Sequence, residues 1–218
     1  MSARQIFSQA DLERVHAATV EAEEGSGGEI VVYVVGRCDA YRGACWRAAA
    51  FAAVMAAAAA GLAHALGGYW GGWGPLWITL PVAGAATIAY AATATWPSLR
   101  RWLTHPESLE RRVEHRAAAA FIEEEVFATV DRTGVLIFLA LFEHRVLILP
   151  DKGIRARVAE EEWQAIARSI AAGIREGRAP EALIEAVGRC GRLLAASGVA
   201  RRADDRDELS SQPRLRDE

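Results

Sequence analysis

The sequence predicts an α/β fold that is interrupted by a pair of membrane-spanning helices. The run Glu29–Gly36 is almost continuously β-branched, which is typical of a strand covered on both faces. Two later apolar runs, Gly134–Leu141 and Arg145–Pro150, are separated by three residues and predict a β-hairpin. Between these strands, Ala48–Leu66 and Leu76–Trp96 each approach the roughly 20 apolar residues that a helix needs to cross a bilayer.

The two apolar stretches are predicted to form a membrane hairpin. Their connection, Gly67–Pro75, carries no charge, and His64 is the one ionisable residue within them. Much of the first stretch is alanine, so its larger side chains must drive insertion into lipid. Small residues such as Gly61 and Gly84 allow close helix packing, either within the hairpin or against another membrane protein. The alternative is a pair of helices buried in a soluble core.

Tryptophan and arginine positions predict the location and orientation of the hairpin. Six of the seven tryptophans flank its two ends, which is typical of interfacial aromatic belts. The arginines lie before the first span and after the second: Arg37, Arg42, Arg47, Arg100, Arg101, Arg111 and Arg112. Because cytoplasmic flanks are enriched in basic residues, we expect a multi-pass protein of the inner (cytoplasmic) membrane with both termini in the cytoplasm.

Helices are expected around the strands. Ser8 is a candidate N-cap for a helix to about Glu24, and a long helix is expected from Pro106 to about Thr129. Two amphipathic helices, Trp163–Arg175 and Pro180–Ala196, follow the strand pair. The predicted organisation is a first part of the α/β domain at 1–43, the membrane hairpin at 44–97, a second part at 98–199 and a disordered charged tail at 200–218.

The expected topology places two aspartates at one end of the sheet. A right-handed crossover would make Glu29–Gly36 and Gly134–Leu141 parallel, with the membrane hairpin inserted in the crossover. Asp131 and Asp151 would then lie together at the open end of the β-hairpin, away from the membrane. The strands and flanking helices together predict an α/β sandwich.

Composition excludes several classes of protein. The formal charge of −3 is too close to neutral to indicate a nucleic-acid partner. The three cysteines, Cys38, Cys45 and Cys190, have no C-x-x-C spacing, which argues against a zinc site or a disulfide framework. The sequence also lacks a phosphate-binding loop, a Gly-x-Ser-x-Gly elbow, a Cys-x5-Arg loop and a His-Glu-x-x-His motif.

A carboxylate site is the main candidate for chemistry. Asp131 and Asp151, with Asp39 as a third candidate, could bind Ca²⁺ or Mg²⁺, which require oxygen ligands. The structural alternative has Asp131 capping the turn before the strand and Asp151 holding the Asp-Lys-Gly turn through its side chain. A second group, at the predicted membrane end, would converge on one another or form surface ion pairs: Asp39, Tyr41, Glu143, His144 and Arg145.

Several segments together resemble the TPM domain, in its membrane-inserted bacterial branch. The matching segments are Ser26–Val32, Asp39–Tyr41, Asp131–Phe138, Glu143–Val146 and Asp151–Ile154, followed by Trp163. The resemblance implies a Rossmann-like α/β/α domain tethered to a membrane, with the two-helix hairpin inserted after the first strand. It also implies divalent-cation binding and a phosphatase activity, which are attached to some members.

Two functions are expected from these observations. The first is an accessory factor for assembly or maintenance of other membrane proteins, whose partners are the lipid bilayer and another membrane protein. The alternative is a divalent-cation-dependent phosphatase that uses Asp131 and Asp151. A self-associating scaffold is a third possibility. No cofactor other than Ca²⁺ or Mg²⁺ is expected, and no complete catalytic constellation is present.

Overall fold

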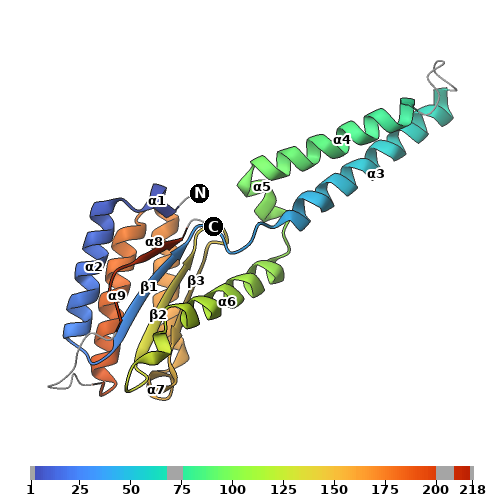
Figure 1. Ribbon diagram of the computed structural model, residues 1–218. Helices are drawn as coiled ribbons and strands as arrows, with labels where there is room; N and C mark the ends of the chain where they lie inside the picture. The colour runs from blue at the N-terminus through green and yellow to red at the C-terminus, as the bar shows by residue number, and fades with distance from the viewer. Residues whose placement is uncertain (1–2, 68–75, 200–208, 217–218) are drawn as a thin grey trace. The chain divides into compact units, whose positions relative to one another are not determined.

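The computed structural model describes residues 3–67, 76–199 and 209–216. They form a mixed α/β fold with a four-stranded sheet and two compact units, Met1–Asp39 with Glu110–Glu218 (the α/β unit) and Ala40–Leu109 (the helical unit) (Figure 1). The elements in chain order are α1 (Ala3–Ile6), α2 (Gln9–Glu24), β1 (Glu29–Val35), α3 (Arg42–Gly67), α4 (Leu76–Thr95), α5 (Pro97–Trp102), α6 (Pro106–Glu123), the 3₁₀ helix η1 (Val126–Ala128), β2 (Gly134–Ala140), β3 (Arg145–Pro150), α7 (Lys152–Arg155), α8 (Glu160–Arg175), α9 (Ala179–Ala196) and β4 (Arg214–Arg216).

The sheet has the order β3-β2-β1-β4, so β1 is a central strand, as its sequence predicts. β1 and β2 are parallel, and their pairing runs from Glu29 opposite Gly134 to Val35 opposite Ala140. β2 and β3 form the expected antiparallel hairpin. The parallel pair is therefore formed by strands that lie on either side of the helical unit in the sequence.

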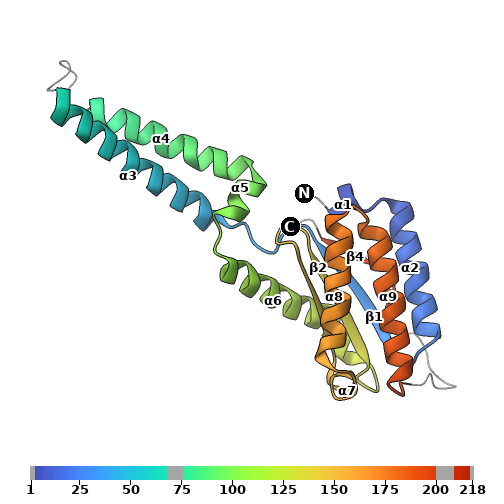
Figure 2. The same ribbon diagram turned by 180° about the vertical axis from the view of Figure 1, so that it is seen from behind.

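Alternating side chains of the central strands supply two apolar cores. On one face, Ile30, Val32 and Val34 pack with residues of α2, α8 and α9. On the other face, Val31, Tyr33 and Val35 pack with residues of α6. Because successive strand residues point to opposite faces, a strand covered on both sides must be apolar throughout. The two ribbon views show α2, α8 and α9 together on one face of the sheet (Figure 2).

Local sequence determines where several helices begin and end. Ser8 caps α2, because its hydroxyl accepts a hydrogen bond from the Asp11 amide while the Asp11 carboxylate accepts from the Ser8 amide. The Ser8 hydroxyl and the Ser8 amide both donate hydrogen bonds to the Asp11 carboxylate, and these two bonds lower the pKa of Asp11. The expected helix from Pro106 to Thr129 is too long. α6 ends at Glu123, since Glu125 adopts a left-handed conformation with φ of 51° before η1 begins.

The prediction of a fully disordered tail is wrong for part of it. Arg214–Arg216 forms β4, which pairs in parallel with β1, while 200–208 and 217–218 lie outside the described residues. The Nε atom of Arg214 lies 2.7 Å from Oε2 of Glu124, and both side chains are largely buried. Ser211 donates a hydrogen bond to Glu23, whose other carboxylate oxygen accepts the Ile30 amide at the start of β1. Charged and polar contacts therefore help to hold this segment, together with Leu209 and Leu215, which pack against the two apolar cores.

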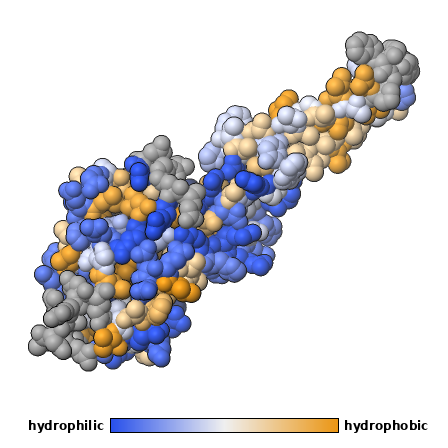
Figure 3. Space-filling model, in the orientation of Figure 1, coloured by the Kyte–Doolittle hydropathy of each residue, from blue (hydrophilic) through white to orange (hydrophobic). Residues whose placement is uncertain are grey.

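The helical unit contains two long helices that pack against each other. α3 and α4 lie side by side in both ribbon views. Both helices are long and apolar enough to cross a membrane, and only 6% of the most apolar window in each is buried. Their exposed surface is coloured mostly white to orange in Figure 3. Large apolar side chains point away from the hairpin, among them Phe51, Leu62, Leu66, Leu80 and Ile88.

A double-mutant cycle on Glu124 and Arg214 should measure the contact that holds β4. Because the Arg214 and Glu124 side chains are only 19% and 13% exposed, we expect a coupling free energy of about 1–3 kcal/mol from urea unfolding of the single and double alanine variants. Arg14 and Glu181 also form an ion pair, but their side chains are 53% and 49% exposed. This control pair should give under about 0.5 kcal/mol. Equal coupling in the two pairs would contradict a buried attachment of β4.

Candidate functional site

Asp151 occupies the most constrained position at the end of the sheet where β3 finishes. Its side chain is 5% exposed and caps α7 by accepting the Lys152 amide at 2.7 Å. Arg132 approaches from the loop before β2 and forms a two-pronged ion pair, with Nε 2.5 Å from Oδ2 and Nη2 3.0 Å from Oδ1. Both carboxylate oxygens of Asp151 therefore accept hydrogen bonds from the protein itself.

The backbone around this ion pair is held by close approach of two turns. Arg132 has φ of 56°, a left-handed conformation that is uncommon for residues other than glycine. The Gly153 amide donates to the Arg132 carbonyl oxygen at 3.1 Å. A Cβ atom at Gly153 would lie 2.5 Å from the Asp131 carbonyl oxygen and 2.6 Å from that of Arg132. The position thus requires glycine, and the Asp-Lys-Gly turn and the loop before β2 form one structure.

This geometry matches the structural alternative for Asp151, which holds the turn through its side chain. The hydrogen bond to Asp151 raises the pKa of the Arg132 guanidinium. A Ca²⁺ or Mg²⁺ ion here would need to displace a guanidinium and a backbone amide from the carboxylate oxygens it requires. The described side chains do not fit a divalent-cation site in this arrangement, although Asp131 lies in the adjoining loop, as expected.

Asp39 lies at the opposite end of the sheet from Asp131 and Asp151. It follows the C-terminal end of β1, whereas Asp131 precedes the N-terminal end of the parallel strand β2. β1 and β2 pair over seven positions. At about 3.3 Å per residue along a strand, the two ends of this pairing are roughly 20 Å apart. Within residues 3–67, 76–199 and 209–216, no three His, Cys, Asp or Glu side chains are grouped so as to hold a metal ion. The three predicted aspartates therefore do not form one pocket.

The polar residues near Asp39 form separate contacts. Asp39 pairs with Arg112 at 2.9 Å, and the exposed Arg145 approaches Glu110 at 3.7 Å. Glu143 is buried and accepts a hydrogen bond from the Cys38 amide at 2.9 Å, which connects the β2–β3 turn to the segment after β1. His144 lies in that turn with φ of 53°, and Tyr41 belongs to the helical unit. Ion pairs, the alternative given from the sequence, account for Asp39 and Arg145, whereas Glu143 is buried against the backbone after β1.

Two further buried polar groups were not indicated by the sequence. The fully buried hydroxyl of Tyr33 accepts a hydrogen bond from Arg116 of α6, whose guanidinium also lies 5.1 Å from the Tyr33 ring centroid. Burial raises the pKa of Tyr33. The carboxylate of the second group, Glu23, accepts a hydrogen bond from the amide of Ile30 in β1. Their partners are distant in sequence or lie across a turn, so no local motif could have identified them.

Cys190 does not have the environment of a nucleophile. It is fully buried in α9, and burial raises the pKa of its thiol to about 12. A thiol must ionise to act as a nucleophile, and a reactive cysteine normally has a pKa below its usual value. Cys190 is therefore a small core residue.

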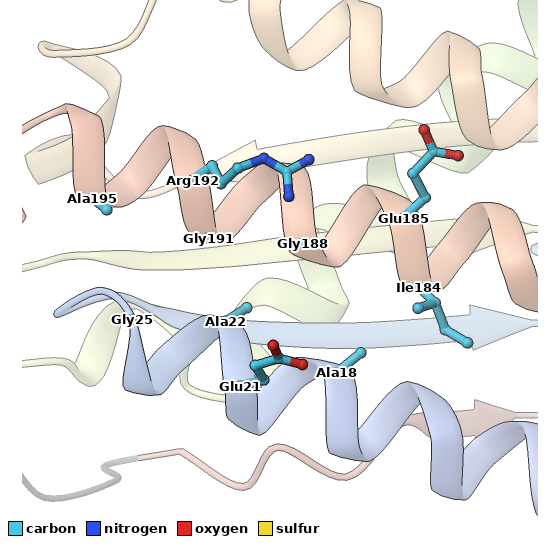
Figure 4. A pocket seen from close by; sticks show the side chains of 10 residues that line it. All are labelled: Ala18, Glu21, Ala22, Gly25, Ile184, Glu185, Gly188, Gly191, Arg192 and Ala195. Atoms are coloured by element: carbon cyan, nitrogen blue, oxygen red, sulfur yellow. The ribbon is translucent and has the colours of Figure 1, made fainter.

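A pocket of about 390 Å³ lies between α2 and α9 (Figure 4). Small residues such as Ala18, Ala22 and Gly188 line it, with Glu21, Glu185 and Arg192 among the lining residues. The neighbouring Gly191 allows close helix contact, since a Cβ atom there would lie 2.8 Å from that of Ala22. The pocket contains none of the predicted site residues, and its lining offers no hydroxyl, thiol or imidazole group for catalysis.

Comparisons with known proteins agree with this fold. Residues 97–193 match the family model of the TPM domain, a range that includes β2, β3, α8 and most of α9. The structure is also similar to the NMR structure of the BA42 protein from the psychrophilic bacterium Bizionia argentinensis, with a TM-score of 0.57 and 17% identity over 95% of this chain and 94% of that one. A search of the curated proteins gave no significant match. Residues 97–193 of this chain therefore match a TPM domain.

Substitutions at the ion pair test its structural role. Both Asp151→Asn and Arg132→Gln should lower the free energy of unfolding by about 1–3 kcal/mol, because each leaves a charged partner without its counterpart. The double variant should lose little more than either single variant, since both remove the same contact. Thermal denaturation with and without Ca²⁺ or Mg²⁺ supplies the second measurement. If Ca²⁺ or Mg²⁺ raises the melting temperature and Asp151→Asn abolishes that rise, Asp151 binds a cation and the purely structural role is contradicted.

Proposed function

We propose that this protein is an accessory factor that assists the assembly or maintenance of another membrane protein. In this proposal α3 and α4 anchor the chain in the inner membrane, and a Rossmann-like TPM domain acts on the cytoplasmic side. The observation that carries the proposal is the exposed apolar surface of α3 and α4, whose most apolar windows are only 6% buried. Such surface is stable in lipid or against another protein, and costly in water.

The dimensions of both helices support membrane anchoring. At 1.5 Å per residue, the 26 residues of α3 and the 20 residues of α4 extend about 39 Å and 30 Å, against a hydrocarbon core of about 30 Å. Arg42 and Arg47 lie at the start of α3, and Arg100 and Arg101 follow α4, whereas the connection at 67–75 has no basic residue. This distribution favours a cytoplasmic location for both termini.

Two glycines support a partner within the membrane. Gly61 in α3 and Gly84 in α4 have nothing within 4 Å of the position that a Cβ atom would occupy. Close contact between α3 and α4 therefore does not account for either glycine. In lipid, small residues on an open helix face allow another helix to approach closely, and van der Waals packing then stabilises the pair. The partner we propose is a transmembrane helix of another protein.

No observation in the described part of the chain favours the alternative of a divalent-cation-dependent phosphatase. That activity would use Asp131 and Asp151, but Arg132 and the Lys152 amide contact both carboxylate oxygens of Asp151. An α/β fold alone does not confer catalysis, because function depends on the residues of the site. We therefore prefer an accessory role to a phosphatase activity.

Labelling from outside the cell tests the proposed topology. A cysteine introduced by Gly72→Cys, between the two helices, should react with a membrane-impermeant maleimide in intact cells. Native Cys38 precedes α3 and is partly exposed, so it should react only after the membrane is permeabilised. Mass spectrometry of the labelled peptides gives the readout. Labelling of Cys38 from outside, with protection of the introduced cysteine, would reverse the orientation and remove the proposed cytoplasmic role.

Substitution of an open glycine tests the proposed partner. Gly61→Leu should leave the hairpin folded, because no atom lies within 4 Å of the added Cβ, but its bulk should block a close-packed partner helix. Purification in mild detergent should recover a stoichiometric membrane protein with the parent chain and several-fold less with the variant. Ala63→Leu adds similar bulk to an exposed position on a different side of α3 and should retain the partner. Purification of the parent chain alone would contradict the proposal.

A further inference from the structure

Positive charge in the helical unit is concentrated at one end. Arg42 and Arg47 lie in the first two turns of α3, and Arg100 and Arg101 lie in α5, directly after α4. Nη2 of Arg47 donates to the Leu103 carbonyl oxygen at 3.0 Å, so the start of α3 and the end of α5 are in contact. Residues 40–109 contain these four arginines and a single acidic residue, whereas the whole chain has a formal charge of −3.

Within the described residues, three of these arginines, Arg42, Arg47 and Arg100, form no ion pair with a carboxylate. Arg100 donates to neutral carbonyl oxygens of Thr93 at 3.2 Å and Ala40 at 3.4 Å, and also to that of Ala94, which satisfies the last turn of α4. Arg47 likewise donates to a carbonyl. Arg42 is exposed and forms no ion pair in the described part of the chain. The backbone contacts position the guanidinium groups and leave their net charge in place.

Exposed tryptophans lie at the same end. Trp46 in α3, Trp96 before α5 and Trp102 at the end of α5 are 65%, 62% and 81% exposed. Indole rings are favourable at the depth of lipid headgroups, where the ring is partly dehydrated and its N–H still finds an acceptor. Guanidinium groups bind phosphate oxygens through paired N–H donors. Arginines among exposed indoles thus match a phosphate carried on a lipid better than a phosphate free in water.

We infer that this end of the helical unit, comprising Arg42, Trp46, Arg47, Trp96, Arg101 and Trp102, binds the headgroups of anionic phospholipids in preference to zwitterionic ones. The inference rests on the proposed membrane anchoring and adds a lipid specificity to it. It has an electrostatic consequence for the rest of the molecule. Since the helical unit is positively charged and the whole chain is negative, the α/β unit is acidic and is repelled by an anionic surface. The basic end offsets this repulsion.

Fluorescence quenching by brominated lipids tests the inference on the full chain reconstituted in phosphatidylcholine vesicles. Tryptophan emission is recorded with equal fractions of dibrominated phosphatidylglycerol or dibrominated phosphatidylcholine. From the attraction of basic residues to anionic lipid, we expect about a threefold preference for phosphatidylglycerol, reduced by about half in Arg42→Gln. Arg168→Gln removes the same charge from an exposed position on α8 and should retain the full preference.

The outcomes separate this inference from the proposed function. Equal quenching by the two lipids, or an equal effect of Arg168→Gln, would overturn the inference while leaving the membrane anchor intact. If inorganic phosphate removes the preference more effectively than sodium chloride of the same ionic strength, the site binds free phosphate and the lipid assignment is overturned. Failure of the parent chain to float with the vesicles would overturn the membrane anchor and, with it, the lipid preference.

Discussion

The parallel pairing of β1 with β2 is the interaction on which the rest of the structure depends. All seven residues of each strand are buried, and the helices of both faces pack against them. Neither strand can bury its apolar side chains without the other, and the whole helical unit separates them in the sequence. The α/β unit is therefore assembled from two segments that contribute jointly to both cores. Long-range pairing of this kind makes folding slow, because the entropy cost of closing the long connecting loop must be met before the strands can pair.

Much of this fold follows from sequence patterns that act locally. The β-branched run of β1 and the paired apolar runs of β2 and β3 predict a central strand and a hairpin, and the sheet has both. Two long apolar helices between the strands are also present. Hydrophobic periodicity is sufficient for these elements, because burial on one or both faces directly requires it.

The rest depends on contacts that no local pattern encodes. β4 has the sequence Arg-Leu-Arg and too few apolar residues to indicate a strand. It forms because Glu124, ninety positions earlier, pairs with Arg214, and because the edge of β1 is open. Similarly, the position of Asp131 and Asp151 at one end of the sheet follows from the hairpin, but the Asp151–Arg132 ion pair depends on a left-handed backbone at Arg132. Such a conformation carries no sequence signature unless glycine or asparagine occupies it.

Insertion of a hairpin between two paired strands has a consequence for biosynthesis. β1 leaves the ribosome about 100 residues before β2, and at roughly 5–20 residues per second this delay lasts about 5–20 s. During that interval, a seven-residue strand with six apolar residues and a free hydrogen-bonding edge has no native partner, which makes the nascent chain prone to misassociation. The apolar helices are translated in the same interval. With the membrane anchoring proposed above, capture of these helices by the translocation machinery would keep the waiting strand at the membrane surface, away from other unfolded chains, until its partner emerges.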